Sequence, residues 1–520
     1  MNHLGDDMSR IQPCAALSLV MLSMRGESGP DPGHPIGWTE SRKNETVWQA
    51  AARGHMWYPL DHEEGVSMIA CGLDFGTSNS AIGVLKGNAT VLTPLEGEAT
   101  LIPSAVFFEA QDRYNVRFGA DAITAYVRQV DGRLFRALKT ILASSLIEEA
   151  TTLGKYKIAL ADIVQIFMRH LKVTAEAFLE REITAVVHGR PVRFVEDDEA
   201  GDRRAERMLE GIARRIGFQE IAFVYEPIAA AYHYEQSATK EELVLVADIG
   251  GGTSDFTVIR LGPGRHLRAE RKEDILACTG VRVGGTDFDT ELSLEAIMPL
   301  LGRGSALLEK GMTMPNALYR ELATWATINF TYTYRNEREV AQLLREAREP
   351  AKVARLLKTL HERLGHRIAF AAEAAKIALS DSHACDIPLD FIEPDLHAPA
   401  TRAGLGRAIG RGIRRIHRSA ADCIAAAGLK PGDIETIFFT GGSSRVPAVR
   451  SAIARAAPGA RPASGSDLLS VAYGLTRTAG RPPGSGQRRR RGGRSRRQSG
   501  RRGRRQRSRS AGRAPGSSRR

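Results

Sequence analysis

The chain has 520 residues, of which 42% are hydrophobic, and a formal net charge of +13. That length leaves room for two or three domains and a large core. Residues 481–520 hold 17 arginines and no lysine or acidic residue, so the other 56 basic and 60 acidic side chains give a net charge of −4. Electrostatic steering of polyanions is therefore excluded for the body of the chain and confined to its tail.

The cysteines argue against a disulfide framework or a zinc site, because their number is odd and no pair has CxxC spacing. They are Cys14, Cys71, Cys278, Cys385 and Cys423. This usage favours a reducing, cytoplasmic compartment. No stretch is long and apolar enough to predict a membrane span. Residues 14–24 have the length of a signal-peptide core, but Asp6 and Asp7 stand where basic residues are expected.

The pattern from residue 68 onward alternates strands and helices. Residues 1–67 lack sustained periodicity, and we interpret them as a disordered extension or a mis-assigned start, with Met68 directly before the first expected strand. Strands are then predicted over 91–97, 101–110, 183–190 and 221–227, and helices over 161–182, 197–218 and 228–235. Gly217 is the expected stop of the second helix. Residues 300–365 contain helix formers and charges without a readable motif.

A buried strand that ends in glycines and hydroxyls occurs three times, at 72–84, 243–259 and 434–444. The first two copies share Asp-x-Gly and a Thr-Ser pair, as duplicated lobes would. Their spacing of about 175 and 190 residues is too wide for a solenoid. Helices that alternate with buried strands predict an α/β architecture.

The glycine turns have the composition of phosphate-binding loops. Glycine lets the backbone approach a ligand closely, and successive N–H groups can form an anion nest, to which Thr77, Ser78 and Thr253 would add hydroxyls. Asp74 and Asp248 each end an apolar strand, where a carboxylate is costly unless a cation compensates it. No GxxxxGK[ST] pattern occurs, which excludes a P-loop enzyme. A triphosphate with Mg²⁺, held by the two aspartates through water, would satisfy both hairpins.

Six ordered motifs between residues 68 and 478 resemble the heat-shock protein 70 (DnaK-type) family of the actin-like ATPase superfamily. They are "GLDFGTSNSAIGV", "LVADIGGGTSDFTVI", "YEPIAAA", "GVRVGGTDFD", "EAAKIALSDS" and "IFFTGGSSRVPAV". "HGRPVRF", "REAREPAKVARLLKTL" and "GSDLLSVAYGL" resemble the YegD-like branch, whose members lack the substrate-binding domain.

This resemblance implies a two-lobed actin-like ATPase fold, with ribonuclease H-like repeats and a nucleotide cleft between the lobes. The expected segments are an N-terminal extension, lobe I, lobe II, a helix returning to lobe I and a disordered Arg/Gly/Ser-rich tail, over 1–67, 68–245, 246–465, 466–478 and 479–520.

The resemblance also implies roles around the phosphates. Asp74 and Asp248 are expected to hold Mg²⁺ through water, and Asp248 to lie near the attacking water. Lys139 would face the β- and γ-phosphates, Glu226 the waters of the metal, and Thr253 the γ-phosphate, while Asp255 is a second candidate for orienting water. The remaining residues implied for the two phosphate loops are Gly76, Thr77, Ser78, Asn79, Gly250, Gly251 and Gly252.

For the nucleoside, the resemblance implies one helical face and three flanking segments. Glu373, Lys376 and Ser380 follow i, i+3, i+7 spacing, which places them on one face, although a solvated charged stripe has the same pattern. The residues implied to close over the base or to floor the cleft are Gly284, Gly285, Gly441, Gly442, Ser443 and Arg445. Asp467 is implied to reach the ribose, although the family's Asn-Pro-Asp is here Ser466-Asp467-Leu468.

The function implied is that of a slow, Mg-dependent ATPase that binds ATP or ADP and acts, chaperone-like, through an unknown protein client or co-chaperone. The aspartate-flanked linker and peptide-binding sandwich of a DnaK-type chaperone are not found after "VAYGLTRTAG". The alternatives are a non-catalytic, nucleotide-gated scaffold and a small-molecule kinase of the same fold. The arginine tail either binds nucleic acid or anionic surfaces weakly or is an incidental low-complexity end.

Overall fold

The computed structural model describes residues 69–87, 89–110, 115–142, 144–153, 156–265, 271–465 and 468–480. The chain divides into two compact units, Met1–Pro482 and Pro483–Arg520, and all the described residues belong to the first. The expected N-terminal extension and the arginine tail lie outside the described residues.

A first sheet, which organises lobe I, has the strand order β11-β10-β1-β2-β3, with β4 paired to β2. β1 runs antiparallel to β2 and parallel to β10, which in turn runs parallel to β11. The strands are β1 (Ala70–Phe75), β2 (Asn79–Lys86), β3 (Ala89–Leu92), β4 (Ile102–Pro103), β10 (Ala185–Arg190) and β11 (Glu220–Tyr225).

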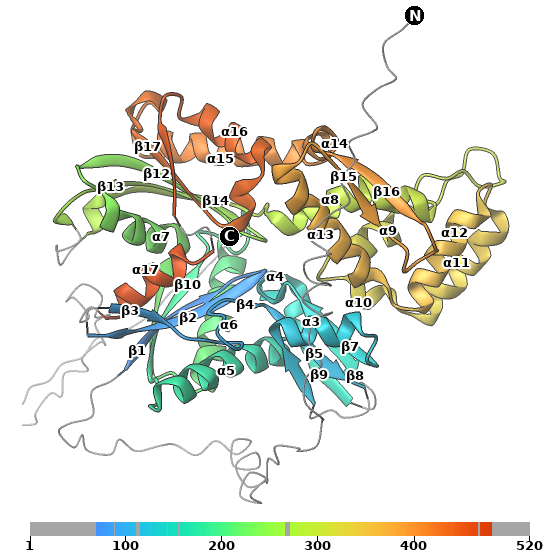
Figure 1. The fold of residues 1–520 in the computed structure, drawn as a ribbon, viewed down its shortest axis with the longest axis horizontal. Coiled ribbons are helices and arrows are strands. Elements are labelled where there is room, and N and C mark those ends of the chain that lie inside the picture. Colours follow the sequence, from blue (N-terminus) through green and yellow to red (C-terminus); the bar gives the residue numbers. More distant parts are fainter. Residues whose placement is uncertain are drawn as a thin grey trace, which may run out of the picture. The chain divides into compact units, whose positions relative to one another are not determined.

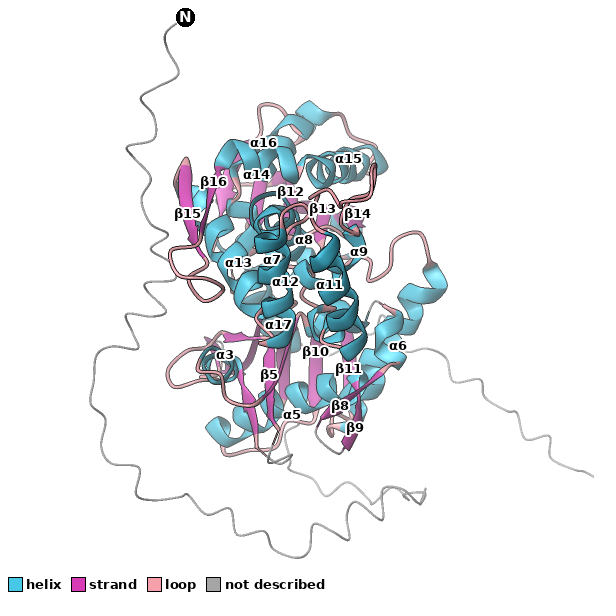
Figure 2. Ribbon diagram, turned by 90° about the vertical axis from the view of Figure 1, so that its right-hand side faces the viewer, coloured by secondary structure: helices cyan, strands magenta, loops and turns pink. Residues whose placement is uncertain are grey.

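A second sheet, which organises lobe II, repeats the same path with the order β14-β13-β12-β17-β18. Again a hairpin of antiparallel strands is followed by two parallel additions. The strands are β12 (Glu242–Ile249), β13 (Ser254–Leu261), β14 (Ile275–Val281), β17 (Thr436–Thr440) and β18 (Arg461–Ser464). The identical topology confirms the expectation of duplicated α/β lobes, and the two groups of strands are separate in Figure 2.

Lobe I carries a small sheet, a hairpin and four helices. The sheet has the order β6-β5-β7 and the hairpin is β8-β9. These elements are β5 (Ala105–Glu109), β6 (Val116–Phe118), α3 (Gly119–Val127), β7 (Gly132–Arg136), α4 (Leu138–Leu142), β8 (Ala150–Leu153), β9 (Tyr156–Ala159), α5 (Leu160–Leu179) and α6 (Glu199–Arg215).

The expected helices of lobe I are confirmed, and their ends follow from local chemistry. Ile163, Phe167 and Leu171 of α5 are fully buried in the core of the lobe, as the apolar spacing predicts. α6 begins where the Asp198 carboxylate accepts a hydrogen bond from the N–H of Gly201. It ends before Gly217, whose φ of +103° is in the region that favours glycine.

The predicted strand over 91–97 is wrong beyond Leu92, where β3 ends. Pro94 follows and has no N–H to donate to a ladder, so pairing stops there. The predicted strand over 101–110 is split at Ser104 into β4 and β5, which pair with different strands. Local sequence thus places the extended segments but not the points at which they change sheet.

Lobe II adds a largely helical region between β14 and β17. Its elements are α8 (Gly285–Leu292), α9 (Asn316–Ala323), α10 (Ile328–Thr331), α11 (Tyr334–Glu346), α12 (Pro350–His361), α13 (Gly365–Asp381), β15 (Ala384–Pro388), β16 (His397–Thr401), α14 (Arg402–Ala408) and α15 (Gly410–Ala426). A further helix of lobe II, α16 (Pro447–Ala456), follows β17. Most of its buried apolar side chains join one core with β12 and β13. Within the described ranges no helix combines the length and the apolar character needed to cross a membrane.

Two helices, α7 (Glu226–Tyr234) and α17 (Ser470–Ala479), join the lobes and lie between the two sheets in Figure 1. α17 packs against both α7 and β1. Glycines allow this close approach: a Cβ on Gly474 would lie 1.8 Å from the Ala229 carbonyl oxygen, and one on Gly72 would lie 2.2 Å from the Thr476 nitrogen. Val187 of lobe I, the alanines of α7 and Phe438 of lobe II share one apolar cluster there. We call this cluster the hinge region.

Candidate functional site

The predicted first phosphate loop is a tight turn between β1 and β2, fixed by a serine from outside it. A Cβ on Gly76 would lie 2.2 Å from the Asn79 carbonyl oxygen, so the turn requires glycine. The hydroxyl of the buried Ser104 donates to the Gly76 carbonyl at 2.7 Å, and its N–H donates to the Ser78 carbonyl at 2.9 Å. The hydrogen bonds from Ser104 therefore fix the backbone that carries the side chains of Thr77 and Ser78.

The predicted second phosphate loop, between β12 and β13, is held by hydrogen bonds from the start of α8. The N–H of Gly285 donates to the Gly250 carbonyl at 3.0 Å. Both the N–H and the hydroxyl of Thr286 donate to the Gly251 carbonyl, at 2.7 and 2.8 Å. A Cβ on Gly284 would lie 2.5 Å from that same oxygen. Gly284 and Gly285 thus support the loop, while their place in the floor of a cleft stays a prediction.

The two loops face each other closely across the lobes. A Cβ on Gly251 would lie 2.4 Å from the Ser78 hydroxyl, and a Cβ on Gly252 would lie 2.9 Å from the Thr77 hydroxyl. The Gly252 position is also 3.4 Å from the hydroxyl of Thr140, which is buried and has no hydrogen-bond partner in the part of the chain that the structure describes. Glycine backbone, hydroxyls and an unpartnered donor are a set of groups that suits phosphate oxygens.

A cluster of carboxylates lies beside the loops. Asp248 and Asp255 are cross-strand partners on β12 and β13, and both are buried. Glu226, also buried, forms an ion pair with Lys139, while the half-buried Asp74 is the last residue but one of β1. One oxygen of Asp255 accepts the Val192 N–H of lobe I at 2.7 Å. Asp255 therefore links the lobes as well as facing this cluster.

Burial and mutual repulsion make the carboxylates hard to ionise. Burial, with repulsion from Glu226, raises the pKa of Asp74 to about 7 and that of Asp255 to about 7. The same causes raise the pKa of Asp248 well above its ordinary value, with Asp255 and Asp74 adding repulsion. Burial disfavours the Lys139 ammonium, yet Glu226 and Asp74 outweigh it and raise the pKa of Lys139. One lysine does not compensate four acids, so the cluster favours a further cation.

Lys139 and Glu226 are positioned by features at the ends of their elements. Ala137 has a φ of +56°, which is uncommon for a residue with a side chain, and it turns the chain from β7 into α4 just before Lys139. Glu226 opens α7, with Pro227 at the next position. A Cβ on Gly189, at the end of β10, would come within 3.3 Å of the Glu226 Cγ. The ion pair therefore joins two rigid ends within lobe I.

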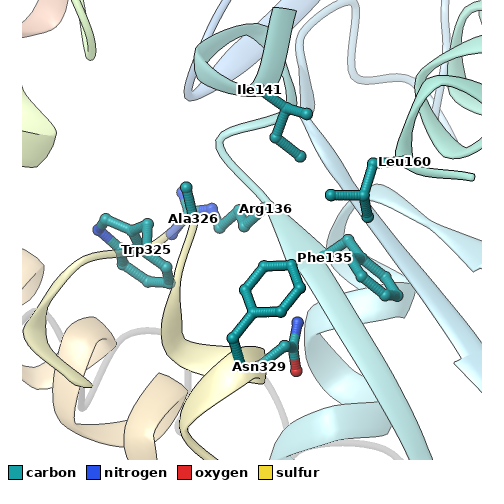
Figure 3. A pocket seen from close by; sticks show the side chains of 8 residues that line it. Phe135, Arg136, Ile141, Leu160, Trp325, Ala326 and Asn329 are labelled. Carbon is teal, nitrogen blue, oxygen red and sulfur yellow. The ribbon is translucent and has the colours of Figure 1, made fainter. Parts of the chain in front are cut away.

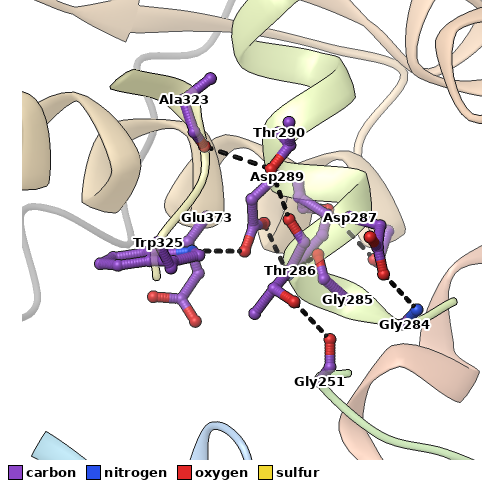
Figure 4. A network of polar contacts seen from close by, with 12 residues as sticks. Gly251, Gly284, Gly285, Thr286, Asp287, Asp289, Thr290, Ala323, Trp325 and Glu373 are labelled. Atoms are coloured by element: carbon purple, nitrogen blue, oxygen red, sulfur yellow. Dashed lines mark hydrogen bonds and ion pairs between the residues drawn. The ribbon is translucent and has the colours of Figure 1, made fainter. Parts of the chain in front are cut away.

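The face of α13 that carries Lys376 lies next to the start of α8, which supports the second loop. Lys376 Nζ lies 2.7 Å from an oxygen of Asp289 and donates to the Gly285 carbonyl at 3.2 Å. A Cβ on Gly285 would lie 2.3 Å from the Ser443 hydroxyl and 3.2 Å from Lys376 Nζ. The structure thus brings together Gly285, Lys376 and Ser443, which are far apart in the chain. Figure 4 shows Asp289, Glu373, Thr286 and Gly251 around the start of α8.

Other predicted nucleoside residues occupy the same edge. Glu373 accepts hydrogen bonds from Arg136 at 2.6 and 3.3 Å, which is a contact between the lobes. Burial disfavours its carboxylate, but Arg136 and Lys376 hold the pKa of Glu373 below its ordinary value. The Ser380 hydroxyl donates to the Lys376 carbonyl at 3.2 Å. Arg445 is exposed at the end of the turn after β17.

Gly441 has a φ of +78°, and a Cβ there would lie 2.8 Å from an oxygen of Asp248. This places the turn after β17 against the carboxylate cluster. Gly442, the next residue, is exposed. The predicted ribose contact of Asp467 lies outside the described residues.

A small pocket lies between the lobes beside this site (Figure 3). Lobe I contributes Phe135, Arg136, Ile141 and Leu160, and lobe II contributes Trp325, Ala326, Asn329 and Phe330. None of the predicted phosphate-loop residues lines it. The Asn329 amide donates to the Leu134 carbonyl at 2.7 Å, so residues 325–330 contact lobe I directly.

Sequence reasoning missed four residues of this site: Ser104, Arg136, Thr140 and Asp289. Asp289 stands inside the quoted motif "GVRVGGTDFD", and Thr140 directly follows Lys139, which was itself predicted, so each had a usable signal in its near sequence. Ser104 and Arg136 lie outside the motifs. Within the described ranges no three His, Cys, Asp or Glu side chains are grouped as direct ligands of a metal ion. The expectation that water mediates the metal contacts stays a prediction.

Two lobes of equal topology, with glycine loops facing each other and two hinge helices between the sheets, define the two-lobed actin-like ATPase fold. The family model described as "Hsp70 protein" matches residues 70–298 and 343–474. The chain therefore belongs to the Hsp70 family, which confirms the predicted family and fold.

A curated relative, the "Chaperone protein DnaK" of Endomicrobium trichonymphae, is 28% identical over 396 residues, which cover 73% of this chain and 52% of the relative. The chain thus spans about half the length of that relative. Assignment to the YegD-like branch stays a prediction.

Proposed function

We propose that this protein binds ATP and ADP with Mg²⁺ between its lobes, hydrolyses ATP slowly and acts, chaperone-like, through a protein partner. The observation that carries the proposal is the cluster of four carboxylates and Lys139 beside two facing glycine loops. A polyphosphate offers oxygens to the loops, and a divalent cation offers the positive charge that the acids lack. Membership of the Hsp70 family supports the same activity.

In this proposal each group has a defined task. Asp74 and Asp248 hold the metal through water, and Glu226 accepts hydrogen bonds from those waters. Bound Mg²⁺ neutralises phosphate charge. Lys139 neutralises the β- and γ-phosphates, and Thr253 donates to the γ-phosphate.

Asp248 orients the attacking water and accepts its hydrogen bond. Burial and repulsion from Glu226 raise the pKa of Asp248, and a cation held beside it would favour its ionised form. Asp255, the cross-strand partner of Asp248, is the second candidate for orienting this water, and its own carboxylate is held by the Val192 N–H.

The nucleoside is proposed to lie on the face of α13. Glu373 and Lys376 bind the ribose hydroxyls, and Ser380 lies one turn further on toward the base. Gly441, Gly442, Ser443 and Arg445 close over the base, the last by stacking its guanidinium group. In the described part of the chain Cys71, Cys278, Cys385 and Cys423 form no disulfide, which supports the proposed cytoplasmic location.

The test combines calorimetry with single-turnover hydrolysis on the full chain. ATP and ADP should bind with a clear gain in affinity from Mg²⁺, and hydrolysis should follow. Asp248→Asn and Thr253→Ala should keep binding within about tenfold and slow hydrolysis by roughly 100-fold or more. The exposed Asp162→Asn is the matched control and should change neither quantity.

Absence of ATP binding would refute the proposal. Binding without hydrolysis would indicate the nucleotide-gated scaffold instead. Phosphorylation of a small molecule in a metabolite screen would indicate the kinase. Hydrolysis that is unchanged in both variants would show that Asp248 and Thr253 are wrongly assigned.

A further inference from the structure

Residues 299–342 are skipped by the family match, yet they contribute a buried tryptophan next to the proposed ribose site. Trp325 lies between α9 and α10 and is 3% exposed. It carries no motif and has no role in the functional proposal above. Its neighbours, however, are the partners of Glu373 and Lys376.

One contact of Trp325 leads to Lys376. The indole Nε1–H donates to one oxygen of Asp289 at 3.2 Å, and the other oxygen of Asp289 lies 2.7 Å from Lys376 Nζ. Asp289 is 2% exposed at its side chain, so little water can replace a lost donor. The indole therefore fixes the carboxylate that holds the lysine (Figure 4).

A second contact leads to Glu373. The guanidinium group of Arg136 lies 4.7 Å from the centre of the Trp325 ring and 5.1 Å from that of Phe370. Both distances are in the range of attractive cation–π contacts. The same guanidinium group donates to Glu373 at 2.6 Å. Since Arg136 belongs to lobe I and Glu373 and Trp325 to lobe II, this stack spans the two lobes.

We propose that Trp325 is a positioning residue that sets both ribose-binding charges, Lys376 through Asp289 and Glu373 through Arg136. The inference rests on the proposed function, because it assumes that these two side chains hold the ribose hydroxyls. It adds a positioning residue from a segment, residues 299–342, that the family match does not cover. Loss of the indole should therefore weaken recognition of the ribose rather than of the phosphates.

The experiment compares ATP with 2′,3′-dideoxyATP, both with Mg²⁺, by calorimetry on the full chain. Wild type should prefer ATP by ~10- to 100-fold, the scale of one or two hydrogen bonds to charged groups. Trp325→Phe keeps a ring beside Arg136 but removes the donor to Asp289, and Trp325→Leu removes both contacts. The preference should fall to about threefold or less in Trp325→Leu and to an intermediate value in Trp325→Phe, while dideoxyATP affinity stays within about threefold.

Tyr319→Phe is the control, because it removes a buried hydrogen bond to the Leu301 carbonyl in the same segment without touching this network. It should leave the preference for ATP unchanged. If the Trp325 variants weaken both nucleotides equally, the residue is merely structural and the inference is overturned. If wild type binds neither nucleotide, the proposed function itself fails, which is a distinct result.

A fluorescence measurement tests the inference even if the Trp325 variants do not fold. The chain has four tryptophans, and Trp38→Phe, Trp48→Phe and Trp57→Phe together leave Trp325 as the only one. ATP should then shift the emission of Trp325, and dideoxyATP at saturation should shift it by less than half as much. Equal shifts with both nucleotides would overturn the inference.

Discussion

Gly474→Ala should destabilise the protein, although alanine is the better helix former. The new methyl group would lie 1.8 Å from the Ala229 carbonyl oxygen and 2.4 Å from its carbonyl carbon. An ordinary contact begins near 3.4 Å, so α17 and α7 would have to separate by about 1.6 Å. Since backbone atoms cannot rotate away, the cost should reach the upper end of overpacking, ~3 kcal/mol. The higher helix propensity of alanine offsets about 1 kcal/mol of this cost, so the free energy of unfolding should decrease by about 2 kcal/mol.

The matched control is Gly406→Ala, in the interior of α14. No heavy atom lies within 4 Å of the Cβ position there, so the same substitution should stabilise the protein by up to ~1 kcal/mol. Urea unfolding of the two full-length variants, followed by circular dichroism, measures the opposite signs. If Gly474→Ala is as stable as Gly406→Ala, the helices do not approach as closely as the structure indicates.

The same substitution should also weaken ATP binding. α7 begins at Glu226, whose carboxylate pairs with Lys139 of α4. A displaced α7 therefore moves one end of that ion pair, whereas Gly406 lies on a helix of lobe II away from it. Reduced affinity in Gly474→Ala and unchanged affinity in Gly406→Ala would connect packing in the hinge region to the proposed site.

Three further predictions concern the cleft and its surroundings. Arg136→Ala removes the contact between lobes with Glu373, so ATP should dissociate at least about tenfold faster in stopped-flow measurements. Gly251→Ala places a Cβ 2.4 Å from the Ser78 hydroxyl, so nucleotide affinity should fall at least about tenfold in calorimetry, with unfolding in urea nearly unchanged. Burial and repulsion from Arg136 lower the pKa of His366 to about 3; the unfolded state therefore takes up a proton below pH 6.5 that the folded state refuses. The free energy of unfolding therefore decreases as the pH is lowered, by about 1.4 kcal/mol at pH 5.5 relative to neutral pH. His366→Phe should flatten this dependence of stability on pH, measured by urea titrations.

Each of these predictions has its own control. Arg117→Ala removes a pair with Glu109 inside lobe I, so ATP release should stay at the wild-type rate. Gly432→Ala meets no atom within 4 Å and should leave affinity intact. His361→Phe changes a histidine whose side chain is 78% exposed and should preserve the pH slope. A variant that behaves like its control would contradict the contact from which it was derived.

Local chemistry made the two hairpins predictable. Each combines an apolar strand, a terminal aspartate and glycines within about 15 residues, and such a pattern specifies a buried strand and a tight turn without help from the rest of the chain. The stop of α6 at Gly217 is local in the same way. The strand predicted over 91–97 failed because the apolar pattern was given more weight than Pro94, which ends β3.

The remainder of the site depends on contacts that have no local signature. Arg136 and Glu373 are 237 residues apart, and each alone reads as a charged residue on the face of an element. Trp325 stands in a stretch without motif or strong periodicity, so nothing near it in sequence indicates that it meets Arg136, Phe370 and Asp289 together.

The duplicated topology explains why the two loops could be predicted from the sequence and the contacts of Arg136, Glu373 and Trp325 could not. The phosphate loops repeat because each lobe builds the same hairpin from its own strands, so each carries its signature within itself. The proposed nucleoside edge occurs once in the described part of the chain, where β7 of lobe I meets α13 and residues 325–330 of lobe II. A site formed by two copies of one motif can thus be recognised from sequence. A site formed by contacts between the two lobes depends instead on how the lobes pack together. Substitutions at that meeting edge should therefore alter release and ribose preference before they alter hydrolysis.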